Sequence, residues 1–288
     1  MNPPTFTRFA AIDRSGALGP RLPGIAIATC APGDAAPTLV RPGHIWSRAE
    51  AFTWTLAATR DAILIGFDLS PTFPHLDRGA YFPGWPASPR DAHSLWALVE
   101  TITATDPDLS APSFVDHPEA SRHFRRHGGR QGDLFAPGRG RLRVVEQATL
   151  TQGIASNFNL VGAAQVGKAS LTGMRLFHRL TGSIPIWPFD PLPTCGPIVV
   201  EIYTSLAAVA AGLPKGRAKV RDAVTLDTAL ARLGSRPHIP LAKYDDHATD
   251  AILAAAWLRA IADDPRRWHP DALTPHVAST EGWTFGVL

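Results

Sequence analysis

The sequence predicts an α/β protein, because short apolar runs of strand length alternate with segments whose apolar residues recur at helical spacing. The chain has 288 residues, of which 45% are hydrophobic, so it is long enough to bury a large core. Charged residues make up only 18%, and the formal net charge is +3. Any attraction to polyanions must therefore come from local clusters of charge rather than from a global field.

Three apolar runs near the N-terminus predict strands. The first, residues 8–13 (Arg-Phe-Ala-Ala-Ile-Asp), ends in an acid and is followed by a Ser-Gly turn. The second and third candidates are residues 24–29 and the shorter run at 38–40. Together they predict a hairpin-like opening of the fold.

A helix, a strand and a second helix are expected next. Ser47 and Glu50 have the spacing of a capping box, which predicts a helix running to about Arg60. Residues 62–68 (Ala-Ile-Leu-Ile-Gly-Phe-Asp) form a continuous apolar run that again ends in an acid. Residues 91–104 place apolar side chains at helical spacing.

The middle of the chain is less regular. From about residue 105 to 196 the sequence is rich in Pro and Gly, and we interpret this part as an insertion. Regularity returns with a strand at residues 197–203. Ala- and Leu-rich segments then predict helices at residues 204–212, 223–233 and 245–262.

The cysteines and the apolar runs indicate in which cellular compartment the protein is expected. The two cysteines, Cys30 and Cys195, belong to no paired motif, which argues against a disulfide framework or a structural zinc site. The N-terminus lacks the pattern of a signal peptide, and the longest apolar run, residues 251–258, is too short to span a bilayer. We therefore expect a cytoplasmic protein without a membrane partner.

Five acids stand out by their positions. Asp13 and Asp68 end apolar strands, Glu201 lies inside one, and Asp250 faces the apolar body of the last long helix, four residues after Asp246. Acids in apolar surroundings need a partner. Two carboxylates 4 Å apart repel by about 4 kcal/mol at an effective dielectric of 20. If these acids converge, they must share protons or a cation such as Mg²⁺, which prefers oxygen ligands.

Each acid also has a purely structural explanation. Asp13 can be a turn residue, Asp68 a strand-end cap, and Glu201 the ion-pair partner of an arginine. Asp246 is best explained alone as a helix-start acid that interacts favourably with the helix dipole. The joint placement of the acids favours a shared metal site over these separate roles.

Five short stretches carry a resemblance to a known family. They are residues 9–16 (Phe-Ala-Ala-Ile-Asp-Arg-Ser-Gly), 66–68 (Gly-Phe-Asp), 200–203 (Val-Glu-Ile-Tyr), 250–256 (Asp-Ala-Ile-Leu-Ala-Ala-Ala) and 281–285 (Glu-Gly-Trp-Thr-Phe). The stretches span most of the chain and resemble the domain of unknown function numbered 429, a family described as predicted nucleases with a ribonuclease H-like fold. The order of strands and acids also looks like that fold.

The resemblance implies a specific architecture. It is a single ribonuclease H-like domain over residues 1–288, with a mixed sheet in the order β-β-β-α-β-α-β-α and flanking helices. Residues 105–196 would then be a long Pro-, Gly- and Arg-rich insertion between the fourth and fifth core strands.

The resemblance also implies a metal-dependent nuclease that uses Mg²⁺ or Mn²⁺. Asp13 would bridge the metal ions, and Asp68, Glu201 and Asp250 would be further ligands and catalytic residues, with Asp246 a weaker candidate. Two such ions about 3.5–4 Å apart can activate water and stabilise the leaving oxygen of a phosphodiester.

A basic stretch lies inside the expected insertion. Residues 122–143 contain seven arginines and two histidines against one acid, which fits salt-sensitive contacts to nucleic-acid phosphates. The alternative is that these arginines pair with acids such as Glu146. The candidate substrate-binding residues are Arg122, Arg125, Arg126, Arg130 and Lys168.

Residues 162–168 match the glycine-rich pattern of a phosphate-binding loop, G-x-x-x-x-G-K. Ala169 stands where such loops carry the Ser or Thr that binds Mg²⁺, so the match is incomplete. A packed, Gly-spaced helix, or a surface where Lys168 contacts phosphate, is the better interpretation.

Three functions follow as hypotheses. The first is a nuclease with a carboxylate-bound metal site. The second is a non-catalytic module that binds nucleic acid or a protein, with acids that only stabilise the fold. The third and weakest is a nucleotide-binding phosphotransferase that uses Gly167 and Lys168. His247, at the start of the last long helix, is expected to be an ordinary surface residue.

Overall fold

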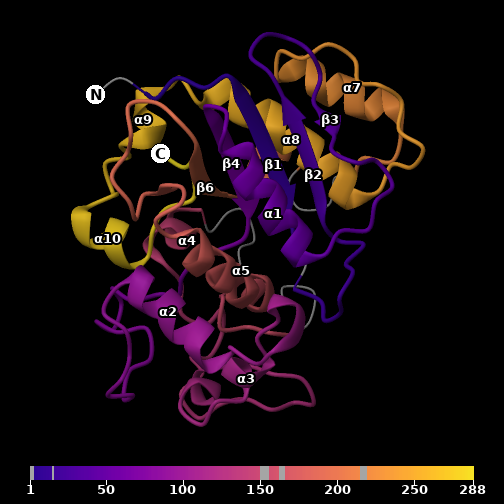
Figure 1. The fold of residues 1–288 in the computed structure, drawn as a ribbon. Coiled ribbons are helices and arrows are strands. Elements are labelled where there is room, and N and C mark those ends of the chain that lie inside the picture. Colours follow the sequence, from indigo (N-terminus) through magenta and orange to yellow (C-terminus); the bar gives the residue numbers. More distant parts are fainter. Residues whose placement is uncertain (1–2, 15, 150–155, 162–165, 215–218) are drawn as a thin grey trace.

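The computed structural model describes the whole chain except residues 1–2, 15, 150–155, 162–165 and 215–218. Ser15 of the expected turn, and residues 162–165 of the glycine-rich motif, therefore lie outside the described residues. Within them, the fold is a mixed six-stranded sheet with helices on both faces (Figure 1). The α/β class predicted from the sequence is confirmed.

The strands lie close to their predicted positions. Each of the five predicted strands is present, and the ends differ by two residues at most. A sixth strand forms inside the segment that was expected to be an insertion. The strands are β1 (Arg8–Asp13), β2 (Ala26–Cys30), β3 (Thr38–Leu39), β4 (Ile63–Asp68), β5 (Ile186–Trp187) and β6 (Ile198–Ile202).

The strand order is β3-β2-β1-β4-β6-β5. β1 runs antiparallel to β2, and β2 to β3, whereas β1, β4, β6 and β5 pair in parallel. Parallel neighbours end at the same edge of a sheet. Asp13 and Asp68 are the last residues of β1 and β4, so the register brings these two acids to one edge.

The helices begin where the sequence predicts caps. Ser47 and Glu50 form the expected capping box of the first helix. Asp245 is the N-cap of the last long helix, where its side chain accepts a hydrogen bond from Ala248 N. No helix among the described residues is long and apolar enough to cross a membrane. The α-helices are α1 (Arg48–Ala58), α2 (Ala92–Ile102), α3 (Pro112–Val115), α4 (Val144–Ala148), α5 (Val166–Leu180), α6 (Thr204–Ala210), α7 (Ala223–Arg232), α8 (Asp246–Ile261), α9 (Pro265–Trp268) and α10 (Pro275–Thr280), with 3-10 turns at Pro107–Leu109 and Ala120–His123.

Residues 105–196 are more regular than expected. They contain α5, which packs against α2, and β5, which pairs in parallel with β6. Glycine and β-branched or polar residues weaken the helical pattern of α5 in the sequence. Gly173 is needed there for packing, because a Cβ atom at this position would lie 2.6 Å from Leu69 Cδ2.

Two hydrophobic cores lie on opposite faces of the sheet. Residues of α1, α2 and α5 cover one face, and α6, α7 and α8 cover the other. α8 packs directly against β1, β2 and β4. Its approach depends on Gly66 in β4, since a Cβ atom there would lie 2.8 Å from both Ile202 Cγ2 and Leu258 Cδ1.

Replacing Gly66 by Ala should therefore destabilise the protein by about 1–3 kcal/mol through overpacking. The measurement is the free energy of unfolding from urea denaturation. Ile202→Val removes Cδ1, one of the atoms that the new methyl group would meet, 2.9 Å away. The double variant should then lose less stability than the sum of the single ones, whereas strict additivity would argue against this packing account.

Candidate functional site

Three aspartates come together where β1, β4 and α8 meet. Asp13 ends β1, Asp68 ends β4, and Asp250 lies in the second turn of α8. Asp13 is buried, and the other two are half-buried. We call these three residues the carboxylate group.

The charges of the carboxylate group interact. Burial, followed by the charge of Asp13, raises the pKa of Asp68 to about 8, and Asp250 contributes further. Burial and the charge of Asp13 also raise the pKa of Asp250 to about 6. Burial raises the pKa of Asp13 itself, although His247 opposes this. The group therefore holds protons at neutral pH unless a cation compensates its charge.

Two neighbouring side chains hold the carboxylate group in place. His247 Nδ1 lies 2.7 Å from Asp13 Oδ2, and this contact raises the pKa of the imidazole. Asp68 accepts hydrogen bonds from Thr204 N (3.3 Å) and Thr204 Oγ1 (3.0 Å). The expectation that His247 is an ordinary surface residue was wrong. The sequence could not indicate its contact with Asp13, because the two residues are 234 positions apart.

Glu201 is not part of this group. Val200 and Ile202 belong to the core on the α8 face, so the side chain of Glu201 points to the opposite face of the sheet. There Arg143 donates to both carboxylate oxygens, from Nη1 at 2.8 Å and from Nη2 at 2.5 Å. Thr284 Oγ1 donates to Oε1 as well. The geometry thus does not fit the expected metal role of Glu201, and matches its alternative role as the partner of an arginine.

Arg143 is the centre of a buried polar network. Its guanidinium also donates to Glu146 Oε1 (2.9 Å) and to the carbonyl oxygen of Glu281 (2.9 Å). The carboxylate of Glu281 accepts from three backbone N–H groups, two after Pro74 and one in α4. Arg141, also buried, pairs with Asp77. These two arginines of the basic stretch are therefore structural, as the alternative interpretation expected.

Asp246 is occupied on the surface. It forms ion pairs with Lys219 and Arg221. Although partial burial opposes it, these two cations lower the pKa of Asp246. Asp246 therefore matches its explanation as a helix-start acid, and the structure gives it no contact with the carboxylate group beyond a weak charge effect on Asp250.

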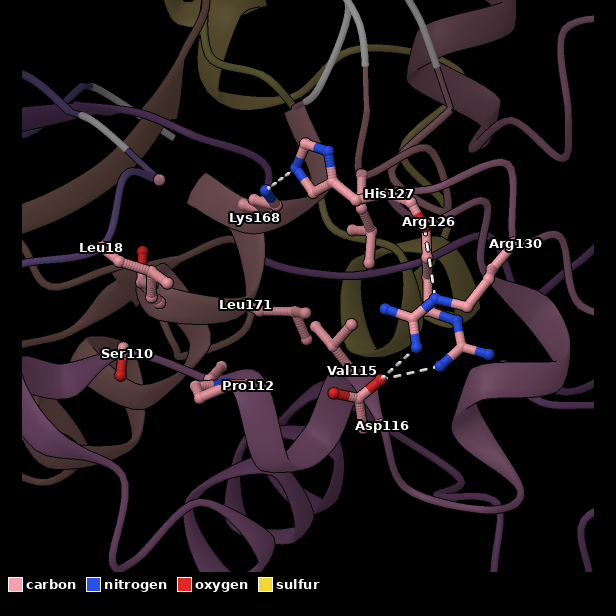
Figure 2. A pocket seen from close by; sticks show the side chains of 14 residues that line it. Leu18, Ser110, Pro112, Val115, Asp116, Arg126, His127, Arg130, Lys168 and Leu171 are labelled. Carbon is pink, nitrogen blue, oxygen red and sulfur yellow. Dashed lines mark hydrogen bonds and ion pairs between the residues drawn. The ribbon is translucent and has the colours of Figure 1, made fainter.

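The five candidate substrate-binding residues separate into two sets. Arg122 pairs with Asp133 (2.8 Å) at the surface, and Arg125 is exposed. Arg126, Arg130 and Lys168 instead line one cavity of about 180 Å³, which Figure 2 shows from close by. Segments more than 35 residues apart in the sequence thus contribute to one cationic cavity.

A buried cation directly after β1 was not predicted from the sequence. Arg14, directly after Asp13, is 7% exposed. Its three guanidinium nitrogens have no hydrogen-bond partner among the described residues. Burial, with the nearby charge of Arg48, lowers its pKa to about 9.

The carboxylate group offers the hard oxygen donors that Mg²⁺ or Mn²⁺ prefers, and a cation would relieve its repulsion. Within the described part of the chain, however, no three His, Cys, Asp or Glu side chains have the close spacing of a metal site. A cation therefore fits the chemistry of these donors, but would have to draw them together. No family model, curated protein or solved structure matches this chain.

The raised pKa of Asp68 predicts how stability depends on pH. The native state keeps a proton on Asp68 that the unfolded chain has lost, so stability should fall as pH rises from about 4 to about 8. Asp68→Asn should remove this fall. At pH 8.5 the variant should have a free energy of unfolding higher by on the order of 3 kcal/mol, a figure reduced to allow for solvent screening of the exposed part of the side chain. Urea denaturation across this pH range tests it, with exposed Asp263→Asn as the control. An equal pH slope in Asp68→Asn and the native protein would contradict it.

Glu201→Gln should instead destabilise the protein at neutral pH. The substitution leaves Arg143 buried beside a neutral amide, and breaking a buried pair typically costs about 3–5 kcal/mol. Thermal denaturation measures the loss. Arg122→Gln breaks an exposed pair with Asp133 and should cost less than about 1 kcal/mol. Similar losses in both variants would be evidence against a special role of the buried pair.

Proposed function

We propose that this protein is a metal-dependent nuclease that hydrolyses a phosphodiester with Mg²⁺ or Mn²⁺ at the carboxylate group. The observation that carries the proposal is the meeting of three acids, whose pKa values are raised by burial and, for Asp68 and Asp250, also by the charge of Asp13. Perturbed acids of this kind are typical of functional sites, because stability alone gives no reason to gather them.

The fold supports the same proposal. A ribonuclease H-like sheet is supported by the antiparallel β1, β2 and β3 beside the parallel β4 and β6, and by the acids at the ends of β1 and β4. On this basis we propose membership in the family of domains of unknown function numbered 429. Residues 105–196 would then be an insertion that adds β5 to the edge of that sheet.

In the proposed mechanism, Asp13, Asp68 and Asp250 hold the cation. When bound, the cation lowers the pKa of water and stabilises negative charge on the phosphate. His247 acts as a positioning residue, because its contact orients the carboxylate of Asp13. Thr204 does the same for Asp68. Glu201 stays with Arg143 and takes no part in the metal shell.

The proposed substrate is nucleic acid. Arg126, Arg130 and Lys168 supply positive charge in one cavity, and Arg122 and Arg125 extend it along the same segment. Such contacts hold the phosphate backbone and weaken with salt.

A non-catalytic module remains a second candidate. The observation in its favour is that the described side chains do not have metal-site spacing, and that Asp13 is already engaged by His247. A phosphotransferase has less support: Lys168 lies within α5 and contacts His127, and a Cβ atom at Gly167 would clash with the carbonyl of Asn157, so packing explains this glycine.

Calorimetric titration of Mn²⁺ tests the metal site. The native protein should bind Mn²⁺, and more tightly at pH 8 than at pH 6, because Asp68 must lose its proton first. Asp13→Asn should lose binding and nuclease activity while staying folded. Asp246→Asn, four residues from Asp250, should keep both.

A variant of Glu201 tests whether this residue lies outside the metal site. Folded Glu201→Gln protein should still bind Mn²⁺, since its carboxylate lies on the other face of the sheet. Cleavage of single- or double-stranded DNA or RNA by Asp13→Asn would refute the proposed catalytic role. Metal-independent binding of nucleic acid, with no cleavage by the native protein, would identify the module instead.

A further inference from the structure

The cavity in Figure 2 combines an apolar wall with a cationic rim. It lies between the chain after β1, the start of α3 and the first turns of α5. Leu18, Val115 and Leu171 supply apolar surface, and Leu18 is 74% exposed although it is a large hydrophobic residue. The basic groups lie together on one side of this surface (Figure 2). The cavity is thus suited to a ligand with an apolar body and a negative charge.

Two guanidinium groups of the rim share one carboxylate. Arg126 Nη1 lies 2.8 Å from Asp116 Oδ1, and Arg130 Nη1 lies 3.8 Å from the same oxygen. Arg130 is exposed, and its Nε donates to the carbonyl oxygen of His127. One carboxylate cannot neutralise two arginines, so this side of the cavity remains positive. A guanidinium group can also stack on a planar base, which is a further way for Arg126 to contact a ligand.

Lys168 provides a third positive charge. Its Nζ lies 2.6 Å from His127 Nε2, and an ammonium group can only donate, so the imidazole nitrogen accepts (Figure 2). No carboxylate among the described residues lies within ion-pair distance of Lys168, and burial lowers its pKa. An anion in the cavity would be a charged partner for Lys168 and would offset the free-energy cost of burying its ammonium group.

The chain after β1 lies directly against Lys168 at the cavity. Gly16 lines the cavity, and a Cβ atom at this position would lie 2.7 Å from Lys168 Cβ. Only a residue without a side chain therefore fits beside this lysine.

We propose that this cavity binds a nucleoside monophosphate, with the phosphate on Lys168 and Arg130 and the base between the apolar wall and Arg126. The volume of about 180 Å³ is below the range of about 300–1,000 Å³ for sites that enclose drug-sized ligands, so the cavity would enclose the base while the phosphate lies on the cationic rim. The same unit occurs as a free nucleotide or as the 5′-phosphorylated end of a strand. The cavity uses none of the three acids, so this binding does not require hydrolysis.

The test is calorimetric titration of AMP into the full chain at low salt without divalent cations. Saturable binding is expected, and Lys168→Met and Arg130→Gln should each weaken it at least about tenfold. The matched control is Arg60→Gln, which removes an exposed arginine outside both the cavity and the basic stretch and should change the Kd less than about twofold. Asp13→Asn should bind AMP as the native protein does, which separates this site from the proposed nuclease.

Further ligands identify which part of AMP is recognised. Adenosine and inorganic phosphate should each bind much more weakly than AMP, and ribose 5-phosphate more weakly as well. Ribose 5-phosphate binding as tightly as AMP would overturn the role of the apolar wall. No saturation with AMP, or an equal loss in Lys168→Met and Arg60→Gln, would overturn the site itself. A 5′-phosphorylated dinucleotide that binds more tightly than AMP would identify a strand end as the source.

Discussion

The buried ion pair between Arg143 and Glu201 connects parts of the chain that are far apart in sequence. It links β6 to the segment that begins α4 and, through the carbonyl of Glu281, to the C-terminal turn. Removing both charges from water is costly, and the cost is offset only because the pair is bidentate and its remaining groups are satisfied. Thr72, Ser70 and Thr284 contribute to this satisfaction.

The acids on the two faces of the sheet differ in the partners that surround them. On the face of Arg143, each acid meets a cation or several N–H donors. On the α8 face, Asp13, Asp68 and Asp250 lie together, with a contact from His247 to Asp13 and from Thr204 to Asp68, and their pKa values rise. A protein that needed these acids only for folding would gain by pairing them as it pairs Glu201. This contrast is the physical basis for assigning function to the α8 face.

The cationic cavity and the carboxylate group are joined by the short segment that leaves β1. Asp13 ends the strand, and Gly16 lies against Lys168 three residues later. The acids and the basic residues are therefore near one another along the chain but belong to separate sites. Such a separation suits a phosphate-bearing ligand, whose negative charge needs the basic side while a cation would compensate the acidic side.

The sequence by itself determined most of the local structure. Hydrophobic period, the capping box at Ser47 and the acids at strand ends predicted five strands, their order along the chain and most long helices, because these signals involve residues within one or two turns of each other. It missed β5, which is only two residues long, and it indicated α5 only as one interpretation of the glycine-rich motif, because glycine interrupts the helical pattern. Only the tertiary structure decided which acids meet. The pleat sends Glu201 away from Asp68, and the contacts of His247 with Asp13 and of Arg143 with Glu201 depend on strand register and packing across the whole chain, which no local pattern encodes.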